Sequence, residues 1–167
     1  MQIQLSRKRR AELTAARAAS LRPRSTSHMS PVRVRIAQSG EYPRLDALYR
    51  AWGYTAGIGA RETVYVAEES EHQIGLVRRT LEEGTVMLRG MQVDPAHQRR
   101  GVGSRLLDAF IADLSAAECY CIPYAHLTAF YNRGGFEVVP EAHAPAFLVQ
   151  RLARYRGEGL DVLIMRR

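Results

Sequence analysis

The sequence predicts a mixed α/β fold, in which a mostly antiparallel sheet is flanked by helices. Short segments that alternate apolar and polar residues, as half-buried strands do, are interspersed with runs that repeat apolar residues every three to four positions, as amphipathic helices do. Three of the strand segments follow one another across short turns, which favours an antiparallel meander. The length of 167 residues suits one domain with a core of its own.

The first part of the domain predicts a strand, a helix and then three strands. The opening segment alternates apolar and charged positions, as a half-buried strand does. Leu45, Leu48 and Trp52 then recur at helical spacing. The expected elements are, in order, a strand at residues 32–37, a helix at 41–52, and strands at 63–68, 73–81 and 85–93.

The fourth of these strands carries an irregularity in its alternation. Val86 and Leu88 are apolar at even positions, whereas Met91 and Val93 are apolar at odd positions. Because a shift by one residue moves side chains to the other face of a sheet, this change of parity predicts a β-bulge at Arg89–Gly90.

A loop with two glycines joins that strand to a long helix. Gln98 begins the loop, Gly101 and Gly103 lie at the start of the helix, and an apolar stripe then runs from Val102 to about residue 117. The first amides of a helix have no internal partners, and the helix dipole adds positive charge there, so the loop suits a phosphate group. A plain turn is the alternative, because the pattern is neither a dinucleotide fingerprint nor a nucleotide P-loop. Charge at the rim would come from Arg99, Arg100 and Arg105.

The last part of the chain predicts short elements separated by strong breakers. Pro123 ends one strand, and Gly134–Gly135 ends a short helix. The expected elements are a strand at residues 119–122, a helix at 127–133, a strand at 136–139, a helix at 144–156 and a closing strand at 160–165.

Positive charge is concentrated in the first 30 residues. They hold seven of the 24 Lys and Arg residues and one acidic residue, whereas residues 31–167 carry 17 basic and 16 acidic side chains. We therefore expect a basic N-terminal arm or extension at residues 1–30, outside a nearly neutral domain at residues 31–167. A nucleic-acid or membrane-surface arm, a transit peptide and a cloning remnant before Met29 are left open. Since the domain is nearly neutral, nucleic acid is not the expected partner.

Two cysteines and the lack of long apolar runs predict a cytoplasmic protein. Cys119 and Cys121 lie on one predicted strand with side chains on one face, where a disulfide would be strained, so we expect both thiols to be reduced. No apolar run approaches the roughly 18 residues of a membrane span, and the N-terminus lacks a secretory signal, so no membrane partner is expected. The histidines have no metal-ligand spacing, so no metal is expected.

Two motifs together resemble those of a known family. Gln98, Gly101 and Gly103 match in register the pattern Gln/Arg-x-x-Gly-x-Gly/Ala at a strand–helix junction, and residues 129–136 contain a Phe-Tyr helix closed by Gly-Phe. In both respects the chain is similar to the GNAT (Gcn5-related) N-acetyltransferases. The resemblance covers about residues 32–167.

The resemblance implies an acetyl-CoA-dependent enzyme that moves an acetyl group directly to an amine. It also implies that the bulged fourth strand parts from the fifth, so that its backbone binds the pantetheine arm and polarises the carbonyl group. Tyr131, whose phenol is protonated at neutral pH, is implied as the general acid for the leaving thiolate. The residues implied to bind acetyl-CoA are Met91, Gln92, Val93, Gln98, Arg99, Arg100, Gly101, Val102, Gly103, Ser104 and Asn132.

The resemblance leaves two parts of the site open. The loop at residues 52–59 would form a wall of the acceptor pocket, or it is a plain connection with aromatic residues that pack on the core. Members of the family often carry Glu on the fourth strand, where this chain has Arg89 and Gln92. For the general base, a water molecule, His126 and Glu118 are therefore the alternatives.

Only the charge of the late segment limits which class of acceptor substrate we expect. Polyamines and Lys-rich tails need carboxylates in the pocket, whereas the late segment offers Arg151, Arg154 and Arg156. We expect a small-molecule amine or peptide that is neutral, acidic or a single amine. A non-catalytic acyl-CoA-binding sensor is the alternative function, nucleic-acid binding through the arm is a third, and a homodimer is left open.

Overall fold

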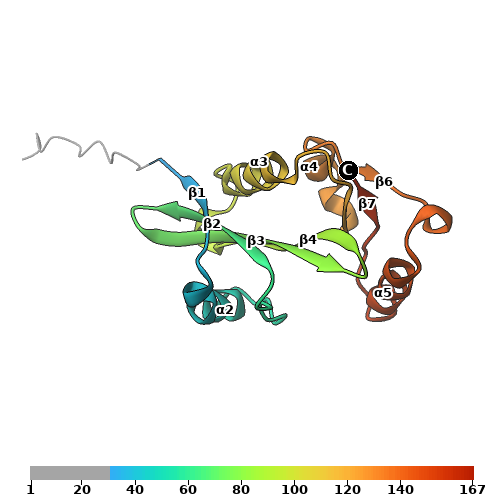
Figure 1. Ribbon diagram of the computed structural model, residues 1–167, viewed down its shortest axis with the longest axis horizontal. Coiled ribbons are helices and arrows are strands. Elements are labelled where there is room, and N and C mark those ends of the chain that lie inside the picture. Colours follow the sequence, from blue (N-terminus) through green and yellow to red (C-terminus); the bar gives the residue numbers. More distant parts are fainter. Residues whose placement is uncertain (1–30) are drawn as a thin grey trace, which may run out of the picture.

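The computed structural model describes residues 31–167, so the predicted basic arm at residues 1–30 lies outside the described residues. Within them, one seven-stranded sheet has the order β1-β2-β3-β4-β5-β7-β6 (Figure 1). Every neighbouring pair is antiparallel except β4 with β5, which is parallel. The predicted mixed α/β class is thereby confirmed. The strands are β1 Arg33–Ile36, β2 Thr63–Glu69, β3 His72–Glu82, β4 Thr85–Val93, β5 Cys119–Cys121, β6 Glu137–Val138 and β7 Met165–Arg166.

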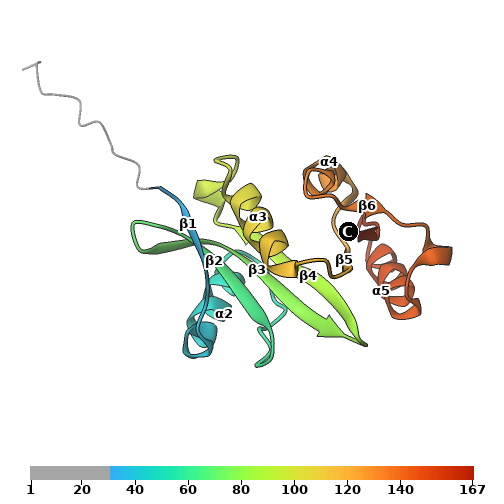
Figure 2. The same cartoon turned by 45° about the horizontal axis from the view of Figure 1, so that its top comes forward.

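Helices cover both faces of the sheet. In Figure 1, α3 and α4 lie on one face, and α2 and α5 lie on the other. Figure 2 shows α4, β6, β7 and α5 grouped together, away from α2. The helices are α2 Tyr42–Ala51, α3 Val102–Leu114, α4 Thr128–Asn132 and α5 Ala146–Gly157, and the short 3₁₀ turns are η1 Ser39–Glu41, η2 Pro95–His97, η3 Ala125–Leu127 and η4 Glu141–His143.

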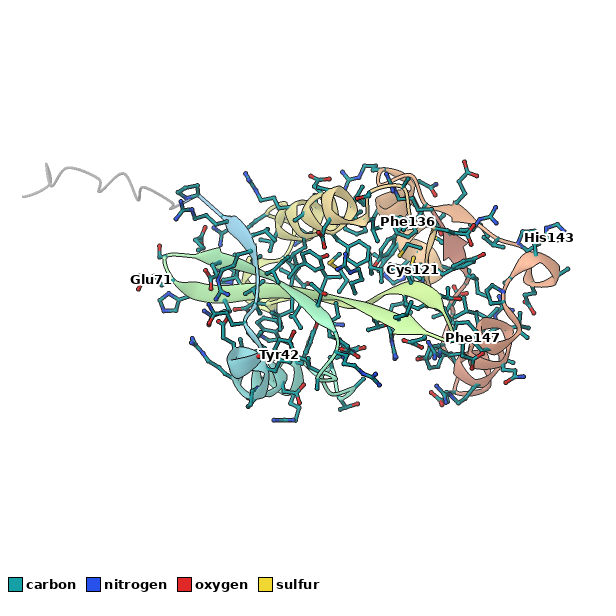
Figure 3. The ribbon with its side chains drawn as sticks, in the orientation of Figure 1. Tyr42, Glu71, Cys121, Phe136, His143 and Phe147 are labelled. Carbon is teal, nitrogen blue, oxygen red and sulfur yellow. The ribbon has the colours of Figure 1, made fainter. Side chains whose placement is uncertain are left out.

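The apolar stripes that helical spacing predicts are the buried sides of these helices. The stripe of α3 packs with Cys121 and Phe136 in one cluster between α3, α4 and the sheet (Figure 3). On the other face, α2 and α5 each contribute to a further cluster. The buried residues of α3 are Val102, Leu106, Leu107, Phe110 and Leu114.

Several elements are shorter than the pattern predicts, and two of these differences have a local cause. α3 stops at Leu114 rather than near residue 117, because Ser115 has a positive φ of 54° and lies outside the helical region. The closing strand β7 holds two residues, rather than residues 160–165. The segment before it runs beside Pro123, which has no amide to donate, so pairing there is limited to an isolated bridge between Tyr124 and Val162.

The predicted β-bulge in the fourth strand is confirmed. In the β3–β4 pairing, Leu76 faces Gln92 and Arg78 faces Arg89, so the residues between them number one on β3 and two on β4. One of these two residues on β4 is Gly90, whose φ of +60° lies in the left-handed region.

Two side chains confine this bulge. The hydroxyl of Tyr49 donates to Gly90 O at 2.7 Å. Arg78 is 1% exposed, lies 5.5 Å from the ring centroids of both Tyr49 and Tyr54, and pairs with Glu62 at 2.7 Å. A Cβ atom on Gly90 would lie 3.0 Å from Arg78 Nε and from Tyr49 Oη, so the bulge is built around a residue without a side chain.

Beyond the bulge, β4 has an open edge. β5 pairs with β4 only at Val86–Cys119 and Met87–Tyr120. From Leu88 to Val93, no strand within residues 31–167 pairs with the edge of β4 that faces β5. The two strands therefore part, as the resemblance implied.

Gly90→Ala is expected to lower the free energy of unfolding more than Gly84→Ala. Gly84 has a φ of +77° but open space around it, so its substitution carries only the left-handed backbone penalty of roughly 1–2 kcal/mol. At Gly90 the added Cβ also crowds Arg78 and Tyr49, which adds about 1–3 kcal/mol. Urea unfolding of both variants measures the difference, and equal losses would contradict a bulge confined by these two side chains.

Candidate functional site

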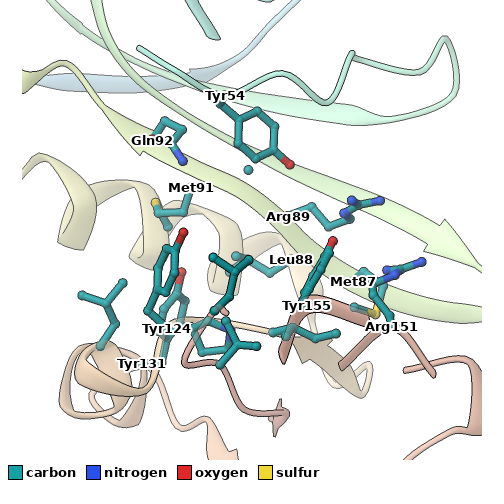
Figure 4. A pocket seen from close by; sticks show the side chains of 16 residues that line it. Tyr54, Met87, Leu88, Arg89, Met91, Gln92, Tyr124, Tyr131, Arg151 and Tyr155 are labelled. Atoms are coloured by element: carbon teal, nitrogen blue, oxygen red, sulfur yellow. The ribbon is translucent and has the colours of Figure 1, made fainter. Parts of the chain in front are cut away.

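A cavity of about 260 Å³ lies where β4 and β5 part (Figure 4). Its walls come from β4, from the segment after β5, from α4 and α5, and from the loop that follows α2. The lining residues are Tyr54, residues 87–92 and 122–124, Leu127, Tyr131, Arg151, Tyr155, Leu160 and Val162.

Tyr131 reaches the cavity from α4, across from β4 (Figure 4). Its side chain is 5% exposed, and its ring lies edge-on to Phe130 and Phe136, with centroid distances of 5.0 and 5.9 Å. Burial, and to a lesser extent the Cys121 thiol, raises the pKa of the Tyr131 phenol well above its usual value of about 10. The hydroxyl therefore stays protonated at neutral pH and is able to donate a proton.

Both cysteines of β5 are buried free thiols, as the geometry of a single strand predicted. Burial raises the pKa of Cys119 to about 12 and that of Cys121 well above its usual value. A nucleophilic thiol needs the opposite, a lowered pKa and access to solvent. Although Cys121 shares a cluster with Tyr131, it is not an activated nucleophile.

The predicted phosphate loop leads from η2 into α3 with free donors at the helix start. Within the described chain, the amides of residues 101–104 donate no hydrogen bond to another protein group, and the first helical bond runs from Arg105 N to Gly101 O at 3.1 Å. Gly101 has φ of +80°, which a residue with a side chain rarely adopts. The helix dipole adds partial positive charge at the same place. These amides can donate hydrogen bonds to an anionic ligand without giving up a contact within the protein.

Side chains hold the loop in place from both ends. Gln98 Nε2 donates to Val93 O at 3.2 Å, which ties the loop to the end of β4. Arg100 binds both carboxylate oxygens of Glu69 at 2.8 and 3.1 Å, which ties the loop to β2. Arg99 between them has φ of +58°, a strained conformation for a residue other than glycine.

Arg133 adds positive charge at this helix start, and sequence reasoning did not assign it. Its Nη2 donates to Ser104 Oγ at 3.1 Å, and its guanidinium lies 5.5 Å from the ring centroid of Phe130. Phe130 in turn lies against Gly103, where a Cβ atom would be 3.5 Å from the ring. Arg133 belongs to the second recognised motif, but it lies 29 residues from Ser104 in the chain.

The other residues predicted to bind acetyl-CoA divide between the cavity and its surroundings. Met91 and Gln92 line the cavity, whereas Val93 packs against the core cluster beneath α3. Asn132 is exposed and lines a separate hollow with Gly135 and residues 136–138. A contact between Asn132 and the cofactor stays a prediction.

The loop after α2 contributes both to the wall of the cavity and to the core, and its role in an acceptor pocket stays a prediction. Tyr54 lines the cavity, whereas Trp52 and Ile58 pack against the cluster under α2. The hydroxyl of Tyr54 accepts a hydrogen bond from Arg78 Nη2 at 3.0 Å. The loop that carries the cavity wall is therefore connected to the side chain that confines the bulge.

Neither side chain considered as general base lines the cavity. His126 is exposed and stacks on Tyr124, with 5.6 Å between ring centroids. Glu118 is exposed and faces Arg166 at 3.6 Å.

Arg89 of β4 and Arg151 of α5 line the cavity and share one carboxylate, which the sequence did not reveal. Glu82, at the end of β3, accepts from Arg89 Nη1 at 3.0 Å and from Arg151 Nη2 at 2.5 Å. Burial alone would raise the pKa of Glu82, but hydrogen bonds from Arg151 and Thr80 and the charge of Arg89 outweigh it and lower that pKa. The Arg89–Glu82–Arg151 cluster thus carries one net positive charge, and its carboxylate is a poor proton acceptor.

Only one of the three late arginines reaches the cavity. Arg154 lies 5.2 Å from the ring centroid of Tyr155, and Arg156 pairs with Glu141 at 2.6 Å. The expectation of a positively charged pocket therefore rests on Arg151 together with Arg89.

In the part of the chain that the structure describes, no three His, Cys, Asp or Glu side chains are grouped so that they could hold a metal ion. None of the helices in residues 31–167 is both long and apolar enough to cross a bilayer.

Comparison with known proteins identifies the class. Residues 60–138, from just before β2 to the end of β6, match the family model described as acetyltransferase (GNAT) domain. Residues 60–138 therefore match a GNAT acetyltransferase domain, which confirms the resemblance and the enzyme class that the two motifs indicated. No curated protein sequence matches the chain.

Solved structures share the fold. N-acetylglutamate synthase from Neisseria gonorrhoeae, solved with coenzyme A and N-acetyl-glutamate, has a TM-score of 0.62 at 21% identity over 83% of this chain and 35% of its own. Rv2747 from Mycobacterium tuberculosis, in complex with CoA and NLQ, has a TM-score of 0.60 at 18% identity, over 80% of this chain and 97% of Rv2747. Naa50 from Arabidopsis thaliana, with the bisubstrate analogue CoA-Ac-MVNAL, has a TM-score of 0.57 at 14% identity. The match covers 81% of this chain and 97% of Naa50. The chain thus spans about a third of the Neisseria enzyme and nearly all of the other two.

The two thiols are expected to be unreactive in the folded protein. Because burial raises the pKa of Cys119 and Cys121, the thiolate fraction at pH 8 falls below that of a free cysteine. Titration with a chromogenic disulfide reagent should find almost no thiol in the native protein and both thiols in guanidinium chloride. Fast reaction of either thiol under native conditions would contradict the buried arrangement.

Proposed function

We propose that the protein is an N-acetyltransferase that moves the acetyl group of acetyl-CoA directly to an amine. The proposal rests on the cavity where β4 leaves β5, with the open edge of β4 on one side and the Tyr131 phenol on the other. The GNAT domain match and the CoA complexes of the similar structures support acetyl-CoA as the donor.

The chain has the groups to hold acetyl-CoA at both of its polar parts. The free amides of residues 101–104, the α3 dipole and the guanidinium of Arg133 suit the pyrophosphate. Peptide groups on the open edge of β4, at Met91 and Val93, suit the amides of the pantetheine arm. When bound, the donor supplies an activated acetyl thioester. We assign its binding to Met91, Gln92, Val93, Gln98, Arg99, Arg100, Gly101, Val102, Gly103, Ser104, Asn132 and Arg133.

Two groups of the chain assist the transfer. A backbone amide of β4 near Met91 polarises the carbonyl oxygen. Tyr131 Oη donates its proton to the leaving sulfur, and burial keeps that proton in place until then. With His126 and Glu118 outside the cavity, water is the proton acceptor among the three alternatives.

The acceptor class follows from the cavity and the similar proteins. The Neisseria structure contains N-acetyl-glutamate, and the Arabidopsis structure contains a peptide analogue. We propose a small-molecule amine or peptide as acceptor. The two free thiols support a cytoplasmic location.

A non-catalytic acyl-CoA-binding sensor is the second candidate, and one observation favours it. Among residues 31–167, no acidic side chain lines the cavity, and Glu82 behind it is held by two arginines. A sensor would bind acetyl-CoA without releasing CoA in the presence of any amine.

Gly103→Asp is expected to abolish acetyl-CoA binding. The new carboxylate would lie among the free amides and repel the pyrophosphate, while its Cβ meets Phe130 only at an ordinary contact distance of 3.5 Å. Isothermal titration calorimetry measures the loss. Gly40→Asp is the matched control, because the space around Gly40 is open, and it should bind as the unaltered protein does. Unchanged binding by Gly103→Asp would contradict the phosphate site.

Tyr131→Phe is expected to lower kcat by about 100-fold or more while sparing the affinity for acetyl-CoA. The ring and its contacts with Phe130 and Phe136 remain, and only the proton donor is lost. Thiol release in the presence of an amine panel gives kcat, and Tyr124→Phe, which removes another phenol of the same cavity, is the control. An unchanged kcat in Tyr131→Phe would remove its role as acid.

A further inference from the structure

The Arg89–Glu82–Arg151 cluster is incompletely neutralised. One carboxylate serves two guanidinium groups, at 3.0 Å from Arg89 and 2.5 Å from Arg151. Arg151 Nη1 is shielded from solvent and has no hydrogen-bond partner among the described residues. A buried donor without a partner is costly, so the positive charge of Arg151 is only partly satisfied within the protein.

The rest of the cavity suits an anion beside this cluster. Arg89 and Arg151 line the cavity, and no described residue that lines it is acidic. The phenol of Tyr54 accepts its hydrogen bond from Arg78, so its own proton is free for a ligand. Figure 4 shows Arg89, Arg151, Tyr54 and Tyr155 around one end of the cavity, with Tyr131 toward the other.

We propose that the acceptor amine carries a carboxylate group, which Arg89 and Arg151 bind. The inference rests on the proposed acetyltransferase function and names the class of acceptor, a free amino acid or a closely similar amino carboxylate. Arginine presents paired donors in a planar fork that matches a carboxylate, and two such forks beside one Glu leave donors for a second carboxylate. The acceptor's amine then lies within the same cavity as Tyr131.

The size of the cavity favours a small acceptor over a long peptide. Its volume of about 260 Å³ lies at the low end of ligand pockets, which range over roughly 300–1,000 Å³. In a peptide, the terminal carboxylate lies far from the terminal amine, so a single small cavity would not hold both. A polyamine would bring several positive charges to a pocket that already has a positive excess.

The acceptor panel tests the carboxylate directly. Thiol release is measured with the full chain for each common L-amino acid, for its carboxamide and for the corresponding amine without a carboxyl group. The best amino acid is expected to exceed its carboxamide in kcat/KM by about 10- to 100-fold, the worth of one or more charge-assisted hydrogen bonds. Equal kcat/KM for the acid and its carboxamide, or acetylation confined to peptides, would overturn the inference while leaving the acetyltransferase function standing.

Substitution of each arginine tests whether it causes the preference for an amino acid over its carboxamide. Arg151→Gln and, separately, Arg89→Gln should raise the KM for the best amino acid by about 10- to 100-fold and leave the KM for its carboxamide within a few-fold. Arg151→Lys keeps the charge and should recover part of the loss. Arg50→Gln, an exposed arginine on α2 whose partner Asp46 lies 3.5 Å away, is the matched control and should change neither value.

Calorimetry with acetyl-CoA separates the two proposals. The arginine variants should bind acetyl-CoA as the unaltered protein does, which shows that they fold. An unchanged amino-acid KM in both Arg151→Gln and Arg89→Gln would overturn the carboxylate site alone. Lack of acetyl-CoA binding by the unaltered protein would overturn the proposed function, and the inference with it.

Discussion

The contact on which the site depends most is the hydrogen bond from the Tyr49 hydroxyl to the carbonyl of Gly90, at 2.7 Å. It holds the bulge of β4 against α2, while Arg78 fills the space that a side chain on Gly90 would need. A bulge bends a strand and increases its twist. β4 therefore leaves β5 after two residue pairs, and the cavity opens between them. The buried Arg78 also binds Tyr54, so the same contacts position one wall of that cavity.

Direct contacts connect the loop before α3 with the part of the cavity that holds Tyr131. Gln98 joins the proposed phosphate loop to the last residue of β4, and Phe130 packs between Gly103 and Arg133 at the start of α3. Tyr131 follows Phe130 directly on α4. The contacts of Phe130 at the start of α3 therefore help to position both the loop and the Tyr131 phenol. Tight packing of this kind transmits small shifts, because protein interiors have few voids into which a side chain can relax. Precise placement of reacting groups requires this rigidity.

Features that are local in the chain could be predicted, and those that join distant residues could not. The parity change around Gly90 predicted the bulge to within a residue, and the spacing of Gln98, Gly101 and Gly103 predicted the loop whose amides are free. In contrast, Glu82 and Arg151 lie 69 residues apart, and no pattern in the sequence connects them. Arg151 was noted only as one of three late arginines, and Arg89 only as the residue in place of a Glu. The shortened β7 needed knowledge of its neighbour, because the missing amide belongs to Pro123 and not to β7 itself.

The parallel β4–β5 junction bears on the order in which the chain gains its structure. β1 to β4 are antiparallel neighbours, and two of their three connections are tight turns, whereas β5 reaches β4 only after the whole of α3 has crossed over the sheet. Closing a longer loop costs more chain entropy before any contact repays it, so pairing of distant strands is slow relative to local hairpins. The cavity lies at that late junction. Folding intermediates in which only the meander of β1 to β4 has formed would have a bulged strand but no pocket. Acetyl-CoA would bind only the completed fold and would stabilise it relative to these intermediates.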